Sequence, residues 1–355
     1  MYQSTHTGAQ VDEAVDKALS ADAVPTANST NLVESGGVAS AVSAVGDAVS
    51  RRNLLDNWYF VGGGSQQGDG QFPINQRGQT AYSGAVYGID RWKGINWVAT
   101  ANVTVQSGSI LLSGTASGSN SCMIRQTIEN AAQFAGKEVT VSVLVGAVQT
   151  NGRPCVFIGT NANDMYATAR LESNGLYSKT AVLPDDITGL FVQIGQHASS
   201  AGSGNTSIEI IAVKLELGST QTLAHQENGV WVLNEIPNFA EELAKCQYYY
   251  QRKESPGSGY NVAMAVSAST ENTVYSVIPL ARAMRYVASP TVNVSGFVAG
   301  HSGGAGAVSS PTYTFRLNKS GTELTMNIVS ASFATKTTYM LWQNIGGYIE
   351  ISCDL

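Results

Sequence analysis

The side chains that most often carry out catalysis are scattered along this chain. No two of its histidines have the spacing of metal ligands; they are His6, His197, His225 and His301. The chain shows no nucleophile elbow, zinc-protease motif or phosphate-binding loop. Acidic pairs occur at Asp185–Asp186, in a turn after Pro184, and at Glu241–Glu242, and we expect both to be solvated. We therefore expect a protein that is not an enzyme and has no cofactor, although carboxylates gathered by the fold could still cleave a polysaccharide.

The cysteines give no sign of redox or metal chemistry either. Each lies in an apolar stretch and none belongs to a C-x-x-C motif; they are Cys122, Cys155, Cys246 and Cys353. Cysteine in such a setting behaves as a small buried hydrophobic residue. The sequence predicts four free, buried thiols.

Aromatic side chains in turn-rich segments suit binding better than catalysis. A sugar ring presents a C–H face that packs on an aromatic ring, while Asn, Asp and Gln exchange hydrogen bonds with its hydroxyls. Loops held by a scaffold are where such function collects. The candidate binding residues are Tyr82, Tyr87, Trp97, Tyr260 and His301. Ordinary core or subunit packing is the alternative for each tyrosine and tryptophan. The remaining tryptophans lie in denser apolar stretches and are expected in cores; they are Trp58, Trp92, Trp231 and Trp342.

The composition excludes several other classes of function. The 355 residues carry a formal net charge of −6, so no basic surface for nucleic acid is expected. The chain contains no run of 18 apolar residues, so no membrane span is expected. The first ten residues lack the basic and apolar regions of a secretory signal, so we expect synthesis in a cytoplasm and no signal-dependent export. Charged residues make up 13%, about half the usual share, and glycine is frequent, which favours all-β structure with many turns.

Period-two alternation predicts a first β domain at 53–236. In "KEVTVSVLVGAV" the valines at 139, 141, 143 and 145 share one face. In "SIEIIAVKLELG" the apolar phase shifts near 210–211, which predicts a β-bulge. The strand spacing, with turn signals between strands, indicates a sandwich or jelly roll.

The β pattern is interrupted once, at 237–247. Phe239, Leu243 and Cys246 have helical spacing there, and Pro237 suits a first helical position. We predict a linker helix. Alternation then resumes and continues to Leu355, which predicts a second β domain at 248–355.

The first fifty residues contain too few large side chains to build a core. A helix is predicted at 9–20, within an attachment segment at 1–34. Residues 35–52 follow with a seam of valines at Val38, Val42, Val45 and Val49. β-branched residues at both seam positions favour three or more strands of coiled coil. An amphipathic helix lying on a globular domain remains the alternative from this segment alone.

Taken in order, several stretches resemble the receptor-binding proteins and tail fibres of tailed bacteriophages and prophages. "STNLVESGGVASAV" resembles the junction before their stalk helix. "NLLDNWYF", "INQRGQTAY" and "YGIDRW" resemble the opening of their jelly-roll domain, and "VKLELGSTQT" its closing strand, which is also similar to that of carbohydrate-binding modules. "CQYYYQR" and "ARAMRYVASPTVNV" resemble the start of a fibre tip.

The resemblance implies a jelly-roll sandwich and a C-terminal β-sandwich tip, preceded by a short trimeric coiled coil at residues 35–52 whose valines face the threefold axis. It implies a homotrimer at the distal tail of a virion that binds glycans of the bacterial surface, with residues 1–34 attached to a tail or baseplate protein. Jelly rolls of this kind sometimes hold a structural Ca²⁺, for which Asp56 and Glu216 are the nearest carboxylates. Two alternatives stay open: a structural tail or baseplate spacer, and a capsule depolymerase.

Overall fold

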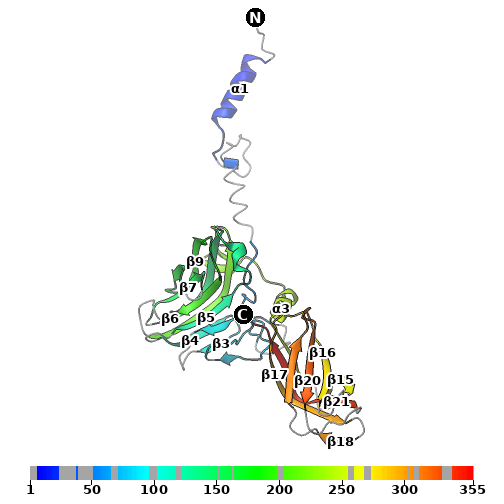
Figure 1. The fold of residues 1–355 in the computed structure, drawn as a ribbon. Helices are drawn as coiled ribbons and strands as arrows, with labels where there is room; N and C mark the ends of the chain where they lie inside the picture. Colours follow the sequence, from blue (N-terminus) through cyan, green and yellow to red (C-terminus); the bar gives the residue numbers. More distant parts are fainter. Residues whose placement is uncertain are drawn as a thin grey trace. The chain divides into compact units, whose positions relative to one another are not determined.

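The computed structural model divides into two compact units, residues 1–52 and 53–355. The structure describes residues 6–23, 37–38, 51–64, 71–82, 84–95, 102–116, 121–150, 152–161, 164–197, 204–254, 260–267, 273–301, 304–307, 312–329 and 338–354. Strands dominate the second unit (Figure 1), and every strand pairing in the described residues is antiparallel. The protein is thus predominantly β, which confirms the predicted all-β class.

The N-terminal unit contains the helix α1 (Gly8–Leu19), close to the helix predicted at 9–20. Thr7 and Gln10 form a capping box that satisfies amides at its start. No residue of α1 is buried, and Val11, Val15 and Leu19 form an exposed apolar stripe. No helix in the described part of the chain has the length and apolar character needed to cross a membrane.

The predicted valine seam lies almost entirely outside the described residues. Val38 is helical and exposed. Val42, Val45 and Val49 fall outside the described residues, so the seam stays a prediction.

Two sheets form the first part of the second unit. The six-stranded sheet has the order β1 (Ala81–Tyr82), β3 (Asn102–Val105), β4 (Ile110–Ala116), β11 (Gly204–Leu217), β6 (Glu138–Thr150), β9 (Gly175–Val182). The five-stranded sheet has the order β2 (Lys93–Ile95), β5 (Cys122–Thr127), β10 (Phe191–Gln196), β7 (Pro154–Gly159), β8 (Ala167–Arg170). Several successive strands change sheet, as from β4 to β5 and from β6 to β7, so the two sheets fold together as one sandwich.

A single apolar core lies between these sheets. It includes the alternating valines at 139, 141, 143 and 145 from β6, and apolar residues of β5, β7 and β10 from the other sheet. Trp58 and Trp92 are buried in it and Trp231 packs at its edge, as predicted. The side chain of Trp342 lies outside the described part.

The predicted bulge in β11 is confirmed, and it provides a hydrogen-bond acceptor for the N-terminal segment of this unit. Ile210 pairs with Val145 and Ala212 with Leu144, so Ile211 has no partner in β6. The Ile211 carbonyl instead accepts a hydrogen bond from the Phe60 amide at 3.0 Å. The segment 53–60 therefore runs along β11 and is the first part of the chain to join the sandwich.

A hairpin and a helix lead out of the sandwich. The strands β12 (Ala224–Glu227) and β13 (Val230–Leu233) are joined by Asn228 and Gly229, both with positive φ, as a two-residue hairpin requires. The helix α3 (Phe239–Gln247) confirms the predicted linker helix. Its N-cap is Asn238, whose side chain accepts from two helix amides, so Pro237 precedes the cap and does not occupy the first helical position.

The C-terminal part contains two further sheets. One has the order β14 (Tyr250–Glu254), β21 (Thr338–Ser352), β17 (Thr291–His301), β18 (Gly304–Ala307), with β15 (Tyr260–Ser267) also paired to β21; the other has the order β16 (Thr273–Pro279), β20 (Glu323–Val329), β19 (Thr312–Leu317). Ile349, Ile351 and Cys353 point into their common core, as the alternation predicts. Leu355 lies outside the described residues.

All four cysteines are free and buried, as predicted. Burial raises the pKa of each thiol, to about 12 for Cys122 and Cys155 and to about 11 for Cys353. Their thiolate fraction at neutral pH is therefore very small.

Candidate functional site

A buried arginine joins the sandwich to the C-terminal sheets. The Arg77 guanidinium donates to Asp90 at 2.9 Å and also pairs with Asp354. It lies over the ring of Tyr250, with 3.8 Å between its central carbon and the ring centroid. Gln76 donates to Asp90 at 2.7 Å and to the Tyr250 carbonyl at 2.9 Å. Burial raises the pKa of Asp90 to about 6, although Arg77 opposes that shift.

A second arginine repeats this arrangement beside the first. Arg91 donates to Asp56 at 3.1 Å and to the Thr127 carbonyl at 3.0 Å. Its guanidinium carbon lies 3.4 Å from the ring centroid of Tyr249. Burial raises the pKa of Tyr249 above its usual range, so the ring stays neutral beneath the cation. Desolvated cation–π contacts of this kind contribute about 2 kcal/mol each.

The Arg77 and Arg91 clusters together form the boundary between the sandwich and the C-terminal sheets, which we call the joint. The linker helix packs on this joint through a residue that was expected to be solvated. Glu242 is only 3% exposed, and its carboxylate accepts the Asn57 amide at 2.8 Å and pairs with Lys245. The expectation was therefore wrong for Glu242. The reason is helical spacing, because Glu242 shares a face with the packed residues Phe239 and Cys246. Glu241, Asp185 and Asp186 are exposed.

The joint brings together stretches that lie far apart in the sequence. Arg77 belongs to "INQRGQTAY", Asp90 and Arg91 to "YGIDRW", and the two tyrosines to "CQYYYQR". Apolar side chains complete it: Phe72, Ile74 and Cys246 form a buried cluster against which Tyr59, Phe239 and Leu243 pack. A joint so dense in buried contacts holds the C-terminal sheets firmly against the sandwich.

An open groove of about 500 Å³ lies at this boundary. The sandwich contributes residues 127–131 and 188–189, and the C-terminal part contributes Tyr248, Arg285 and Tyr286. Tyr248 is the first of three consecutive tyrosines, and it faces solvent while the other two are buried in the joint. The groove is thus lined by segments that also form the joint.

The groove combines exposed rings with fixed polar groups. Tyr248 and Tyr286 are 39% and 47% exposed. Arg285 pairs with Glu129 and donates to the Cys353 carbonyl at 3.4 Å. The Thr188 hydroxyl, at the other side, donates to Asn161 at 2.8 Å. Rings that offer an apolar face, next to donors and acceptors held in place by their own hydrogen bonds, suit a sugar better than an apolar ligand.

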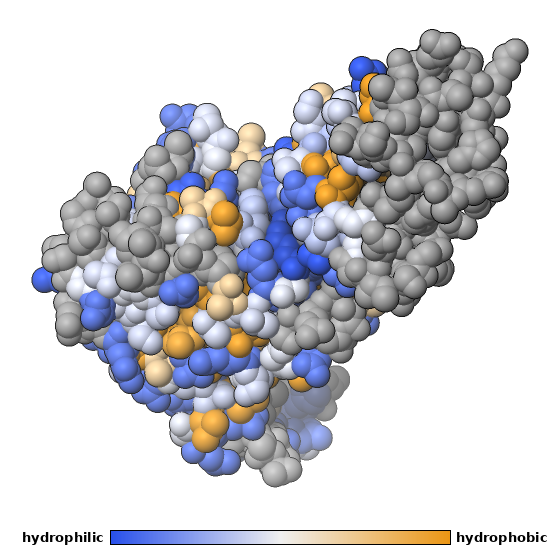
Figure 2. Space-filling view, turned by 90° about the horizontal axis from the view of Figure 1, so that it is seen from below, coloured by the Kyte–Doolittle hydropathy of each residue, from blue (hydrophilic) through white to orange (hydrophobic). Residues whose placement is uncertain are grey.

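The surrounding surface is mixed in character. Figure 2 shows small apolar patches among hydrophilic ones on the face that it presents, with a concentrated hydrophilic patch near the middle of the view. The coloured residues of this face do not form one broad apolar area of the kind that marks a large protein interface.

Of the five binding residues proposed from sequence, Tyr87 alone has a described side chain, and it does not line this groove. Tyr87 is half-buried, with the Arg77 guanidinium 5.3 Å and the Lys93 ammonium 5.5 Å from its ring centroid, so it belongs to the edge of the joint. Tyr82, Tyr260 and His301 lie in β1, β15 and β17, with their side chains outside the described part. Trp97 lies outside the described residues.

Sequence reasoning missed Tyr248, Arg285 and Tyr286. Two signals pointed to them: the run "YYY" directly after a predicted helix, and the polar "ARAMRY" outside any alternating segment. Neither signal shows which of three consecutive tyrosines faces solvent, because that depends on the partner sheet.

The two carboxylates considered for calcium do not fit that ion. Asp56 pairs with Arg91, and the fully buried Glu216 accepts the Thr222 amide at 2.7 Å and its hydroxyl at 2.5 Å. Calcium takes six to eight oxygen ligands, whereas one carboxylate oxygen of Asp56 and both of Glu216 already accept hydrogen bonds from protein donors. In the described residues no group of three or more His, Cys, Asp or Glu side chains could hold a metal.

Comparisons with known proteins identify no relative. No protein-family model and no curated protein matches the chain. Among solved structures, one of Red Clover Necrotic Mosaic Virus is 10% identical with a TM-score of 0.14, and covers 78% of this chain and 97% of that one. A salicylate 1,2-dioxygenase from Pseudaminobacter salicylatoxidans is 10% identical with a TM-score of 0.13, covering 69% and 71%. Likenesses this weak carry no argument about fold or function.

Proposed function

We propose that this protein is a homotrimeric receptor-binding protein, of the tail-fibre kind found in tailed bacteriophages and prophages, that attaches a virion to bacterial surface glycans. The observation that carries the proposal is the open groove, with its two exposed tyrosines beside the Arg285–Glu129 pair. Its size lies within the range of roughly 300–1,000 Å³ that small ligands occupy.

A shallow site of this kind binds one glycan weakly, because sugar hydroxyls exchange water for protein partners at little net gain. Three copies on one rod change that, since avidity can exceed single-site affinity by about 10²–10⁴. The trimer is supported by the valine seam in the sequence and by the uncovered stripe of Val11, Val15 and Leu19 on α1. In this proposal residues 1–34 contact the tail or baseplate, and the protein lies at the distal tail.

The assignment of the sandwich as a jelly roll is part of the same proposal. A sandwich whose successive strands change sheet, with β11 near the middle of one sheet, is consistent with a jelly roll. The C-terminal sheets then form the tip.

A capsule depolymerase is less well supported by the groove. Glycoside hydrolysis uses a pair of carboxylates on either side of the bond. Among the described residues that line this groove Glu129 is the sole acid, and it pairs with Arg285.

The test is binding of the full-length protein to a panel of bacterial cells and purified surface polysaccharides. The double variant Tyr248→Ala/Tyr286→Ala should lose binding, because each aromatic contact contributes about 0.5–1.5 kcal/mol per site and three sites act together. The matched control is Tyr275→Ala, which removes a 41% exposed tyrosine from β16, outside the groove.

The alternatives predict other results. A spacer binds no cell and no polysaccharide in the panel. A depolymerase releases reducing ends from a polysaccharide that it binds. Binding that survives in the double variant would place the receptor site elsewhere.

A further inference from the structure

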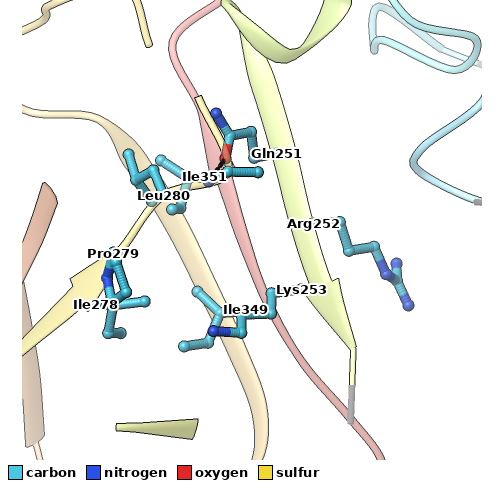
Figure 3. Close-up of a pocket in the computed structure, with 9 residues that line it drawn as sticks. Gln251, Arg252, Lys253, Ile278, Pro279, Leu280, Ile349 and Ile351 are labelled. Atoms are coloured by element: carbon cyan, nitrogen blue, oxygen red, sulfur yellow. Dashed lines mark hydrogen bonds between the residues drawn. The ribbon is translucent and has the colours of Figure 1, made fainter. Parts of the chain in front are cut away.

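A second cavity, of about 320 Å³, lies inside the C-terminal part and away from the groove. It opens between β14 and the end of β16, at the edge where the two C-terminal sheets separate (Figure 3). The described residues that line it come from β14, from β21 and from the end of β16 with the two residues after it. None of its described lining residues also lines the groove.

The floor of this cavity is apolar. Ile278, Ile349 and Ile351 are each at most 3% exposed and belong to the core between the C-terminal sheets. Pro279 and Leu280 continue that surface toward the mouth. The cavity is therefore an extension of the core that reaches solvent, and an alkyl chain is the chemistry that it suits.

One cation stands at the mouth. Lys253 pairs with Ile349 across the strands, so both side chains lie on the cavity side of the sheet. Figure 3 shows Lys253 reaching over Ile349, while Arg252 points away. Arg252 is held by Glu254 and Glu350, whereas in the described residues Lys253 has no acidic side chain within salt-bridge distance.

The other polar group of the lining is already occupied. The Gln251 amide donates to the Gln247 and Arg282 carbonyls at 3.0 and 2.8 Å, and its oxygen accepts the Ala281 amide at 3.0 Å. Both N–H groups of the Gln251 side chain are thus used within the protein, so Gln251 has no donor left for an anionic head group. The charge at the mouth is left to Lys253.

We propose that this cavity binds an anionic amphiphile, a single alkyl chain that ends in a carboxylate or a phosphate. The chain lies against Pro279 and Leu280, above the buried isoleucines of the floor, and the head group pairs with the Lys253 ammonium. The inference is independent of the glycan groove, because none of the described lining residues is shared.

The test is calorimetric titration of the full-length protein at pH 7.5 with decanoate, decyl phosphate and 1-decanol. We expect one saturable site per chain, with affinity rising about fourfold per methylene from hexanoate to decanoate. Lys253→Gln should weaken both anions about three- to fivefold and leave decanol unchanged. Lys253→Arg should restore anion binding. Decyl phosphate has one more alkyl carbon than decanoate, so the ratio of their affinities, corrected for about fourfold per methylene, shows which head group the site prefers.

Two further variants complete the design. Ala281→Phe places a ring in the mouth from an exposed loop position and should abolish binding of all three probes. Lys319→Gln removes an exposed lysine that does not line the cavity and should change nothing. Absence of saturable binding would overturn the proposal. Equal binding of decanoate by wild type and Lys253→Gln would also overturn it, because Lys253→Gln is a surface substitution that should not disturb folding.

Discussion

Replacing Arg77 with methionine tests whether the joint is held by buried charge. Methionine keeps an unbranched apolar stem and removes the guanidinium. The side chains of Asp90 and Asp354 are only 1% and 5% exposed, so both carboxylates lose their cation where water hardly reaches. Removing one partner of a buried pair costs about 3–5 kcal/mol. We expect the free energy of unfolding at pH 7.5 to fall by that amount.

The loss should depend on pH in a defined direction. Burial already raises the pKa of Asp90 to about 6, and removal of Arg77 raises it further. Asp90 then accepts a proton at a higher pH in the variant than in the wild type, and the uncompensated charge disappears. Between pH 8 and pH 6 the difference between the two proteins should shrink by up to about 1.4 kcal/mol per pH unit.

Urea unfolding followed by tryptophan fluorescence measures both effects, since Trp58 and Trp92 lie in the sandwich core. Arg316→Met, at an exposed position of β19, is the matched control and should stay within about 0.5 kcal/mol of wild type. A loss below 1 kcal/mol for Arg77→Met, or one that does not change with pH, would refute the reasoning.

Three further predictions address other parts of the molecule. The pKa of Asp90 is raised in the folded state. The contribution of Asp90 to the free energy of unfolding is therefore largest below pH 4 and declines as the pH rises to about 6. The difference in the free energy of unfolding between wild type and Asp90→Asn should decline over the same range. The four buried thiols should react with a thiol reagent only as fast as the protein unfolds, and rapid labelling of native Cys155 or Cys353 would contradict their placement. Light scattering should give three times the chain mass, and a wild-type monomer at micromolar concentration would contradict the trimer. Val42→Asp/Val45→Asp should fray the stalk without unfolding residues 53–355, as circular dichroism can check.

Features that depend on neighbouring residues were predictable from the sequence. The bulge at Ile211 is visible as a shift of apolar phase, because alternation records which face of a strand is buried. The linker helix was predicted to within two residues of its observed start, since Phe239, Leu243 and Cys246 must share a face. The alternation at 349–353 placed three side chains in a core for the same reason.

Features that depend on which segments meet were not predictable. Glu242 has the sequence context of a solvated residue, and its burial follows from the arrival of the Asn57 amide, 185 positions away. Glu129 and Arg285 are separated by 156 residues, and nothing local to either one indicates their pairing. The groove forms where the sandwich and the C-terminal sheets meet, so its residues carry no common spacing. Tyr82, Trp97, Tyr260 and His301 stay predictions.

The most direct measurement is the crystal structure of the full-length protein with an oligosaccharide from a polysaccharide that it binds. The account predicts a sugar ring packed against Tyr248 or Tyr286, with hydroxyls hydrogen-bonded to the Arg285–Glu129 pair, in each of three subunits. Electron density for the sugar at another surface, with this groove empty and Tyr248→Ala/Tyr286→Ala still binding, would contradict it.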